Sequence, residues 1–315
     1  MRALRYHGPG DVRLEDVPDP VPGPGDVLVQ VEVALTDGTD LKAYRRGHPV
    51  LLSDPPSPFG HEFCGIDVAT GRRVVAANSA PCGECARCRR GQETLCENLF
   101  PLLNGAYAEL LLVPARIAQT NLLPVPPRLD PEIAAMVEPL ACCLHGVVRA
   151  GVERGQTVAV LGTGPIGLML AAAARDAGAS VVTVGGRPER RELAPAFGAE
   201  PGDGRGADVV LEAAGTEESW ATAVDLAAPG GTVLFFGGRE RGTAQAVDTF
   251  RLHYEELRLV GAFHHTPRTV RAALAFLASG AYPWDRLVTH RVGLEGVVPL
   301  FEDPPRDLLK AAVLP

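Results

Sequence analysis

The strongest constraint on the fold of this chain is an alternation of apolar segments and helical stretches between residues 157 and 263. The strand-like segments are TVAVLG (157–162), SVVTVG (180–185), DVVLEAAG (208–215), GTVLFFGG (231–238) and LRLVGAF (257–263). Continuously apolar strands that alternate with helices are typical of a parallel sheet covered on both faces. We therefore expect an α/β fold with a doubly wound sheet here.

The first of these strands runs directly into a glycine-rich turn that opens a helix. The turn consists of Gly162, Thr163, Gly164, Pro165, Ile166 and Gly167. The first glycine permits a tight turn, the second lets a pyrophosphate approach the backbone, and the third allows close helix packing. Amides at the helix N-terminus then face the phosphates. A chance glycine-rich turn is the alternative, but the flanking strand and helix favour a dinucleotide site.

The end of the second strand bears on the choice of nucleotide. About twenty residues after the turn, an NAD-preferring site carries an acidic residue that binds the ribose hydroxyls. This chain instead has Gly185, Gly186 and Arg187, followed by Arg190 and Arg191. Arginine pairs with a 2′-phosphate through two parallel hydrogen bonds, so we expect these residues to bind NADP in preference to NAD. The alternative is that the arginines are solvated charges at a helix start.

The spacing before the third of these strand-like segments is unusually short. Only eight residues separate Ala199 from the strand that starts at Asp208. A complete doubly wound half needs another strand and a crossover helix in this interval. We therefore expect this half to be truncated at an edge strand, where the loss leaves the cofactor crevice covered.

Residues 1 to about 115 have a different pattern from the α/β region. Short β-rich runs such as MRALRY and DVLVQVEVAL are separated by glycine and proline clusters, which predicts a compact all-β domain. Helical spacing over residues 131–151 predicts a helix between domains. The tail carries one helix and short strands. We expect residues 1–139 and 264–315 to form one domain and residues 140–263 the other.

Charge and hydropathy exclude several classes of function. A formal net charge of −8 and a pI near 5.5 argue against a surface dedicated to nucleic acid or anionic membranes. The first residues lack an apolar core of signal-peptide length, and the long apolar run 158–174 is interrupted by the glycine turn. We expect a cytoplasmic protein without a transmembrane segment.

Four of the seven cysteines lie within fifteen residues, as Cys82, Cys85, Cys88 and Cys96. In a chain expected to stay in a reducing compartment, metal ligation is favoured over disulfides. Soft thiolates in a tetrahedral set suit Zn²⁺, and four of them leave no open coordination position. We expect a structural zinc that stabilises a lobe over residues 80–100. Redox cysteines or an iron–sulfur cluster are the alternatives.

The chain carries three motifs in sequence: Gly-His-Glu at residues 60–62, then the four cysteines, then the nucleotide turn. With these motifs in this order, the chain resembles the zinc-containing medium-chain alcohol dehydrogenase family. The resemblance covers nearly the whole sequence. The other segments that carry it are DVLVQVEVALTDGTDLKAYRRG, PFGHEFCG, GAYAELLLVP, VEPLACCLHG and LVTHRVGLEGVVPLFE. It implies a GroES-like catalytic domain, a Rossmann domain, and assembly as a homodimer or homotetramer.

The resemblance also implies a second, catalytic zinc, with ligands at Asp37, His61 and Glu138 and with Glu62 beside them. The family usually reads Cys-Gly-Thr/Ser-Asp where this chain reads Asp-Gly-Thr-Asp from residue 37. A carboxylate therefore replaces a thiolate, and the harder ligand set is expected to hold zinc less tightly. Cys142, four residues after Glu138, is the alternative ligand.

Two further roles follow from the resemblance. Thr39 occupies the position of the family's hydroxyl relay and is expected to pass on the proton of the alcohol. The relay often ends at a histidine, but this chain has Lys42 there, so the route beyond Thr39 stays open. Glu62 is expected either to bind zinc transiently or to orient the ligands around it.

The implied activity is a zinc- and NADP-dependent dehydrogenase that oxidises a secondary alcohol, a polyol or the anomeric hydroxyl of an aldose. A carboxylate in place of the thiolate also occurs in some archaeal, NADP-linked glucose dehydrogenases of the family, which favours a sugar substrate. Two alternatives stay open. One is a zinc-independent quinone or enoyl reductase on the same scaffold, and the other is a non-catalytic, zinc-lobed nucleotide-binding protein.

Overall fold

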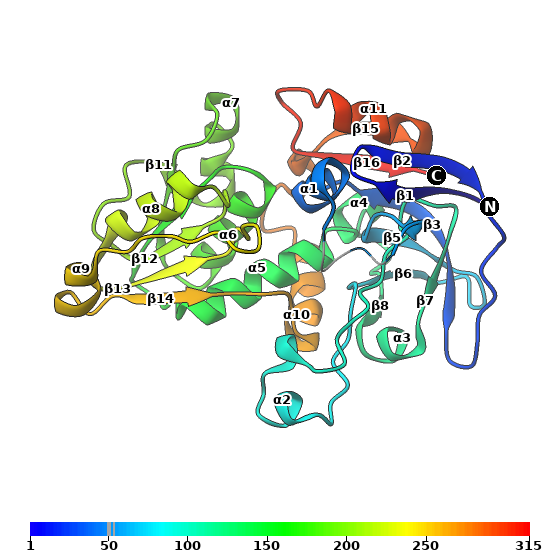
Figure 1. Cartoon of the computed structure of the whole chain (residues 1–315), viewed down its shortest axis with the longest axis horizontal. Helices are drawn as coiled ribbons and strands as arrows, with labels where there is room; N and C mark the ends of the chain where they lie inside the picture. Colours follow the sequence, from blue (N-terminus) through cyan, green and yellow to red (C-terminus); the bar gives the residue numbers. More distant parts are fainter. Residues whose placement is uncertain (49–51, 53) are drawn as a thin grey trace. The chain divides into compact units, whose positions relative to one another are not determined.

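The structure is a computed structural model and describes residues 1–48, 52 and 54–315. The chain divides into two units, one formed by Met1–Ala141 with Thr266–Pro315 and the other by Cys142–His265. The sequence predicts unit boundaries after residues 139 and 263, and the observed boundaries lie two residues later along the chain. Figure 1 shows the first unit built mainly from strands and the second from a sheet with helices.

The first unit is organised by one long strand, β3 (Val27–Leu35), which pairs antiparallel with three other strands. Its main sheet has the order β15-β16-β3-β5-β6-β8 with β7 beside β3, and a smaller sheet has the order β2-β1-β4. The other strands are β1 (Arg2–Gly8), β2 (Asp11–Asp16), β4 (Ser57–Pro58), β5 (Glu62–Asp67), β6 (Arg73–Ala76), β7 (Leu110–Val113), β8 (Leu122–Pro124), β15 (Val288–Gly293) and β16 (Lys310–Leu314).

The expectation that the first 115 residues are all-β is wrong in detail, because helices interrupt the strands. The α-helices of this unit are α1 (Gly38–Arg46), α2 (Ala86–Arg89), α3 (Ala115–Asn121), α4 (Pro131–Ala134), α10 (Pro267–Ala278) and α11 (Val297–Glu302), and its 3₁₀ turns are η1 (Glu93–Leu95), η3 (Trp284–Leu287) and η4 (Leu294–Gly296). Helix α1 is short, polar and opened by a glycine, so its sequence carries a weak helical signal. Its N-cap, Asp37, stabilises it instead.

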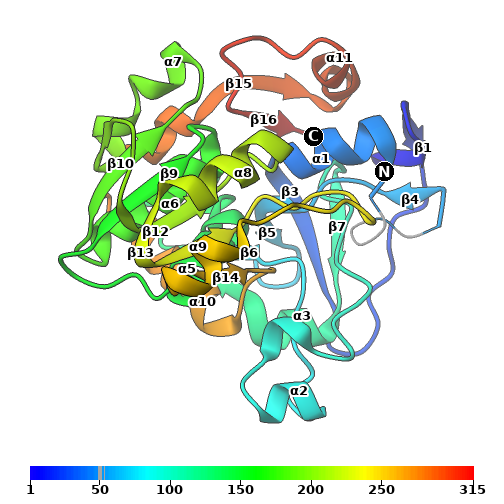
Figure 2. The ribbon, with the colours of Figure 1, turned by 60° about the vertical axis from the view of Figure 1, so that its left-hand side comes forward.

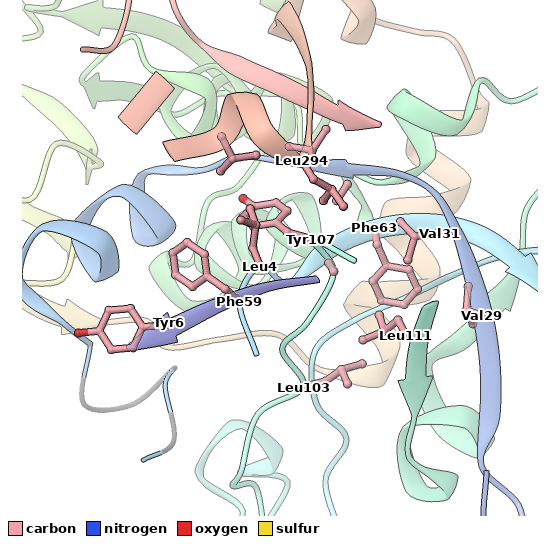
Figure 3. Close-up of a cluster of buried hydrophobic side chains, with 14 of the residues drawn as sticks. Leu4, Tyr6, Val29, Val31, Phe59, Phe63, Leu103, Tyr107, Leu111 and Leu294 are labelled. Carbon is pink, nitrogen blue, oxygen red and sulfur yellow. The ribbon is translucent and has the colours of Figure 1, made fainter. Parts of the chain in front are cut away.

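The core of the first unit is a cluster of aromatic and aliphatic side chains between its sheets (Figure 3). Phe59 and Tyr107 are fully buried and meet edge to face, with ring centroids 5.7 Å apart. Gly60 has a φ of +87°, and a Cβ on it would lie 2.7 Å from the ring of Tyr107. Glycine is therefore required at position 60, where the chain turns from this core into His61.

The second unit is a six-stranded parallel sheet in the order β11-β10-β9-β12-β13-β14. The strands are β9 (Thr157–Leu161), β10 (Ser180–Val184), β11 (Ala199–Pro201), β12 (Ala207–Glu212), β13 (Ala227–Phe235) and β14 (Arg258–Gly261). The helices are α6 (Pro165–Asp176), α7 (Pro188–Arg191), α8 (Glu217–Leu226) and α9 (Thr249–Tyr254), with the 3₁₀ turn η2 (Ala194–Phe197). Helix α6 packs on β9 and β10, and α8 packs on β12 and β13 (Figure 2). The expected α/β fold is confirmed.

The expected truncation of this sheet is only partly correct. The strand expected to be lost is present as the three-residue edge strand β11, which pairs with β10. The crossover helix is what is missing between β11 and β12, where residues 202–206 form a turn without a helix. The interval is short because a turn replaces that helix.

The single helix expected over residues 131–151 is two helices, α4 and α5 (Val137–Ala150). Asp130 caps α4, and Pro131 occupies its first turn. Among the residues that the structure describes, no helix combines the length and the apolar character that crossing a membrane requires.

Candidate active site and metal centres

The antiparallel register of three neighbouring strands brings distant residues together at one end of the main sheet. Leu35, at the end of β3, pairs with Glu62 of β5 and with Ala312 of β16. Thr36, the next residue, forms two hydrogen bonds with Ala311. The Thr36 backbone N–H donates to the Ala311 carbonyl oxygen at 2.9 Å, and the Ala311 backbone N–H donates to the Thr36 hydroxyl at 2.9 Å. The beginnings of α1, β5 and β16 therefore share one small region.

Asp37, His61 and Glu62 form a group whose potential ligand atoms lie within 4.8 Å of one another. The two oxygens of Asp37 have different surroundings. Oδ1 caps helix α1 by accepting a hydrogen bond from the Asp40 backbone N–H at 2.7 Å, and Oδ2 lies 3.9 Å from Nε2 of His61. One oxygen thus fixes the side chain and the other faces the imidazole.

A buried carboxylate orients the imidazole of His61. Nδ1 of His61 lies 3.1 Å from Oδ1 of Asp40, and both side chains are almost fully buried. The hydroxyl of Tyr107 donates to the other oxygen of Asp40 and lies 3.1 Å from the carbonyl oxygen of Leu35. A ring that donates from Nδ1 presents the Nε2 lone pair toward Asp37, as in carboxylate–histidine–metal arrangements.

The charges around His61 suit a divalent cation. Burial lowers the pKa of His61, but the carboxylates of Asp40, Asp37 and Glu138 together raise it by a larger amount. The pKa of His61 therefore lies well above its ordinary value. Burial raises the pKa of Asp40, and the charge of Asp37 adds to this effect. One imidazole nitrogen surrounded by several buried carboxylates is a donor set that zinc accepts.

Glu62 is paired with a lysine from the far end of the chain. Nζ of Lys310 donates to both carboxylate oxygens of Glu62, at 2.7 and 2.6 Å, and lies 3.3 Å from the carbonyl oxygen of Thr36. The side chains of Lys310 and Glu62 are 1% and 0% exposed. Burial raises the pKa of Glu62, and the charge of Lys310 opposes that rise. Burial lowers the pKa of Lys310, but the carboxylates of Glu62, Asp37 and Asp40 together raise it above its ordinary value.

The other two residues expected at this site have different positions. Glu138 is buried in the first turn of α5 and is not part of the group of Asp37, His61 and Glu62, but its charge acts on His61. Burial raises the pKa of Asp37, but the charges of His61 and Lys310, the Asp40 backbone N–H and the nearby side chain of Thr39, in the first turn of α1, together lower it below its ordinary value. Thr39 thus lies near one of the expected metal ligands.

Sequence reasoning missed how three residues, Asp40, Tyr107 and Lys310, support this site. Asp40 follows the expected ligand by three positions, and its spacing on the opening turn of a helix is a usable signal. Tyr107 carries no comparable local signal. The partner of Glu62, Lys310, is 248 residues away along the chain, and only the strand pairing of the folded sheet reveals it.

The four cysteines of the lobe converge as a metal site requires. Their sulfurs lie within 4.8 Å of one another, and those of Cys85 and Cys96 are 3.9 Å apart. Tetrahedral zinc with Zn–S bonds of about 2.3 Å places sulfurs about 3.8 Å apart. Backbone N–H groups of Cys85 and Cys88 point at the sulfurs of Cys82 and Cys85, at 3.4 and 3.5 Å. Such hydrogen bonds favour the thiolate form.

The lobe needs a metal because it has few buried side chains. Between residues 81 and 100 only Cys96 and Leu99 are buried. The backbone N–H of Glu84 is the main cause that lowers the pKa of Cys82 to about 6, whereas burial raises the pKa of Cys88 to about 12. The four sulfurs can all be ionised only with a cation among them.

We expect Cys82→Ser to lower the zinc content of the purified protein by about one ion per chain, because the remaining three thiolates no longer complete the tetrahedral set. The lobe is also expected to become susceptible to proteolysis near α2. Metal analysis by mass spectrometry and limited proteolysis measure both effects. Cys142→Ser is the matched control, since Cys142 lies outside the four-cysteine group. Unchanged zinc content in Cys82→Ser contradicts the assignment.

The glycine-rich turn of the second unit has the shape that the sequence predicts. Gly162 has a φ of +104°, and a Cβ on Gly167 would lie 2.0 Å from the carbonyl oxygen of Gly162. Gly164 is the N-cap of α6, and Pro165 occupies its first turn. Ile166 follows within the same turn of the helix. Helix N-termini have free amides that bind phosphate.

The arginines after β10 lie at the two ends of the short helix α7. Gly185 and Gly186 have φ values of +71° and +85°, and a Cβ on Gly186 would overlap the hydroxyl of Thr163 in the glycine turn. Arg187 is the exposed N-cap of α7. Burial and the charge of Arg187 lower the pKa of Arg190, so two guanidinium groups are held near each other. Arg191 is exposed at the end of α7.

Comparison with known families matches both units. The family described as "Alcohol dehydrogenase GroES-like domain" matches residues 23–127, and the one described as "Zinc-binding dehydrogenase" matches residues 200–279.

Relatives of similar length match along the whole chain. L-Galactonate-5-dehydrogenase of Escherichia coli K12 is 30% identical over 99% of this chain and 98% of its own length. D-Altritol 5-dehydrogenase of Agrobacterium fabrum is 32% identical over 98% of this chain and 97% of its own length. The crystal structure of a zinc-binding dehydrogenase from Sinorhizobium meliloti 1021 bound to NADP superposes with a TM-score of 0.90, at 35% identity, over 100% of this chain and 99% of that one.

Proposed function

Because this chain belongs to the zinc-containing medium-chain alcohol dehydrogenase family, we propose that it oxidises a polyol or sugar hydroxyl with NADP as the hydride acceptor. The family assignment makes it a zinc- and NAD(P)-dependent oxidoreductase that acts on CH–OH groups. The proposed substrate class and the preference for NADP go beyond that assignment. They are supported by polyol and sugar-acid dehydrogenases among the relatives and by NADP in the similar structure.

The observation that carries the proposal is that Oδ2 of Asp37 faces Nε2 of His61, while Asp40 binds the other nitrogen of the imidazole. We assign the catalytic zinc to Asp37 Oδ2, His61 Nε2 and a carboxylate oxygen of Glu138. When bound, zinc polarises the oxygen of the substrate hydroxyl, and NAD(P) accepts the hydride from its carbon. Asp40 holds the imidazole in the tautomer that leaves Nε2 free.

The remaining residues of the site handle charge and the proton. Thr39 is assigned a relay of the proton, because its side chain lies near Asp37: its hydroxyl oxygen accepts the proton of the substrate hydroxyl while its own proton passes outward. Glu62 is assigned an indirect role: both of its oxygens bind Lys310, so it balances the buried ammonium and fixes the strand that starts next to His61. This electrostatic role differs from transient ligation of zinc, which is one of the two roles expected for Glu62 from the resemblance; the other is orientation of the ligands.

In the second unit we assign the pyrophosphate to the turn of Gly162, Gly164 and Gly167 and the adenosine 2′-phosphate to Arg187 and Arg191. Neither Gly185 nor Gly186 offers an acidic side chain to repel that phosphate. The oligomeric state, expected to be a homodimer or homotetramer, stays a prediction.

A substrate panel tests the proposal. The zinc-loaded enzyme is assayed with polyols, aldoses and simple secondary alcohols, each with NADP and with NAD. The expected result is turnover of a polyol or aldose at a kcat/KM higher with NADP than with NAD. Turnover only of simple alcohols rejects the substrate class. Nucleotide binding without turnover of any panel member favours the non-catalytic alternative.

Removal of the metal distinguishes the proposal from a zinc-independent reductase. Dialysis against a chelator strong enough to empty the Asp37 site is expected to abolish oxidation of the substrate, because that site loses its Lewis acid. Added Zn²⁺ is expected to restore the activity. A quinone or enoyl reductase on this scaffold would retain its activity throughout, and such retention contradicts the proposal.

We expect Arg187→Ala to raise KM for NADP by about 10- to 100-fold and to change KM for NAD by less than about twofold. One charge-assisted hydrogen-bond pair to a phosphate accounts for a change of this size. Steady-state kinetics with both nucleotides measure the two values. Arg205→Ala, an exposed arginine in the turn before β12, is the matched control. An equal change for both nucleotides rejects the assigned 2′-phosphate contact.

A further inference from the structure

Glu212 is a fully buried acidic residue at the carboxyl end of β12. Strand β12 lies beside β9 at the centre of the sheet. On one side of this pair the strands follow as β10 and β11, and on the other side as β13 and β14. In open α/β sheets, ligands bind outside the carboxyl ends of the strands at such a switch point. The mechanism assigned above uses no group of β12, so this buried carboxylate has no role there.

The side chain of Glu212 shapes the loop that follows its own strand. Its Oε1 accepts hydrogen bonds from the backbone N–H groups of Ala214 and Gly215 and from the hydroxyl of Ser219, each at 2.7 Å. A buried carboxylate is costly unless such donors satisfy it. The three bonds therefore fix residues 213–216 and the first turn of α8 in one arrangement.

Glu212 also anchors the loop after the next strand. The backbone carbonyl oxygen of Glu212 accepts hydrogen bonds from the backbone N–H groups of Phe236 and Gly237, at 3.0 and 3.1 Å. A Cβ on Gly237 would lie 2.4 Å from the backbone nitrogen of Gly215 and 2.9 Å from Oε2 of Glu212. The two loops thus pack backbone to backbone over the carboxylate, which requires glycine at position 237.

An aromatic side chain closes this arrangement. Nε1 of Trp220 donates to the carbonyl oxygen of Gly237 at 3.1 Å, and its ring stacks on Phe235 with centroids 4.1 Å apart. On the other side, a Cβ on Gly162 would lie only 3.6 Å from Ala214. The turns after β9, β12 and β13 therefore meet around Glu212.

We infer that Glu212 is a positioning residue that holds the loops 213–216 and 236–238 as the surface for the nicotinamide half of the dinucleotide. The inference rests on the dinucleotide site proposed above. That site places the adenosine half near Arg187, beyond β9 and β10. The second half then falls on the side of β12 and β13, where Glu212 sets the position of the backbone without touching the reacting atoms.

The test compares Glu212→Gln with Asp208→Asn, two isosteric changes on the same strand. Asp208 is at the opposite end of β12, where Oδ2 accepts hydrogen bonds from the Thr157 backbone N–H and hydroxyl at 2.7 and 2.8 Å. Both variants are made in a Trp284→Phe background, so that the emission of Trp220 reports binding in the second unit. The ligands are NADPH and adenosine 2′,5′-bisphosphate, which lacks the nicotinamide half.

We expect Glu212→Gln to raise the Kd for NADPH by about tenfold or more, because a neutral amide oxygen accepts the three hydrogen bonds more weakly than a carboxylate does, and to leave the Kd for the bisphosphate unchanged. Asp208→Asn is expected to change neither Kd, whatever stability it loses. An unchanged Kd for NADPH, or an equal rise for both ligands, overturns the inference. If the parent protein does not bind the bisphosphate, the proposed dinucleotide site itself is wrong.

A milder variant covers the case in which Glu212→Gln does not fold. Ser219→Ala removes one of the three donors to Oε1 and leaves the carboxylate in place. It is expected to weaken NADPH binding by about threefold, a smaller change in the same direction. Bisphosphate binding is again expected to stay constant. Unchanged NADPH affinity in a folded Ser219→Ala protein counts against the inference.

Discussion

Replacing Asp37 with alanine is expected to lower kcat/KM by about 1,000-fold or more and to leave the affinity for NADP unchanged. The change removes one of the proposed ligands, and each 1.4 kcal/mol of lost transition-state stabilisation corresponds to a tenfold loss of rate. The nucleotide turn belongs to the other unit, so its affinity is expected to persist. Steady-state kinetics and equilibrium titration measure these two quantities, and metal analysis measures the zinc content.

A helix cap is also lost in Asp37→Ala, so the control must lose a cap as well. Asp130→Ala removes the N-cap of α4, where the side chain accepts a hydrogen bond from the Glu132 backbone N–H, in the same unit. That variant is expected to lose about 1 kcal/mol of stability and no activity. Asp37→Cys is expected to retain zinc against a chelator better than the parent chain does. Parent-like turnover and metal content in Asp37→Ala would contradict the assigned site.

Replacing Lys310 with methionine is expected to destabilise the first unit by about 3–5 kcal/mol, because the carboxylate of Glu62 is then buried without its partner. Both side chains are almost completely inaccessible, so water cannot replace the ammonium. In a Trp220→Phe background, the emission of Trp284 follows denaturation of the first unit. The free energy of unfolding from such curves is the quantity to compare.

Two variants separate pairing from packing in this experiment. Glu62→Gln combined with Lys310→Met removes both charges and is expected to recover a large part of the lost stability. Arg73→Met breaks the more exposed pair of Arg73 and Glu32, at 2.6 Å, and is expected to cost less than about 1 kcal/mol. A loss in Lys310→Met no larger than that in Arg73→Met would show that the buried pair contributes little.

The parts of the fold that could be predicted from sequence were those with strong local signals. The parallel sheet was predictable because its strands are apolar on both faces and separated by helices. Helix α1 was missed because a glycine and polar residues hide its period, and its stability comes from the cap at Asp37. The edge strand β11 was missed because three residues carry no detectable alternation.

The candidate site divides in the same way. The spacing of the cysteines and the glycine turn are local motifs, and the structure brings each set together. Asp37 and His61 could be suggested only through the family resemblance, because each is an ordinary polar residue by itself. The pairing of Glu62 with Lys310 depends on the register of β16 against β3, which no local pattern specifies.

The proposed catalytic zinc is held by an imidazole and carboxylates rather than by sulfur. Anomalous diffraction at the zinc edge from crystals of the zinc-loaded protein locates each bound zinc. We expect two peaks per chain, one among Cys82, Cys85, Cys88 and Cys96, and one about 2.0–2.2 Å from Asp37, His61 and Glu138. A single peak at the cysteines, or a second peak bound by other residues, would contradict this assignment.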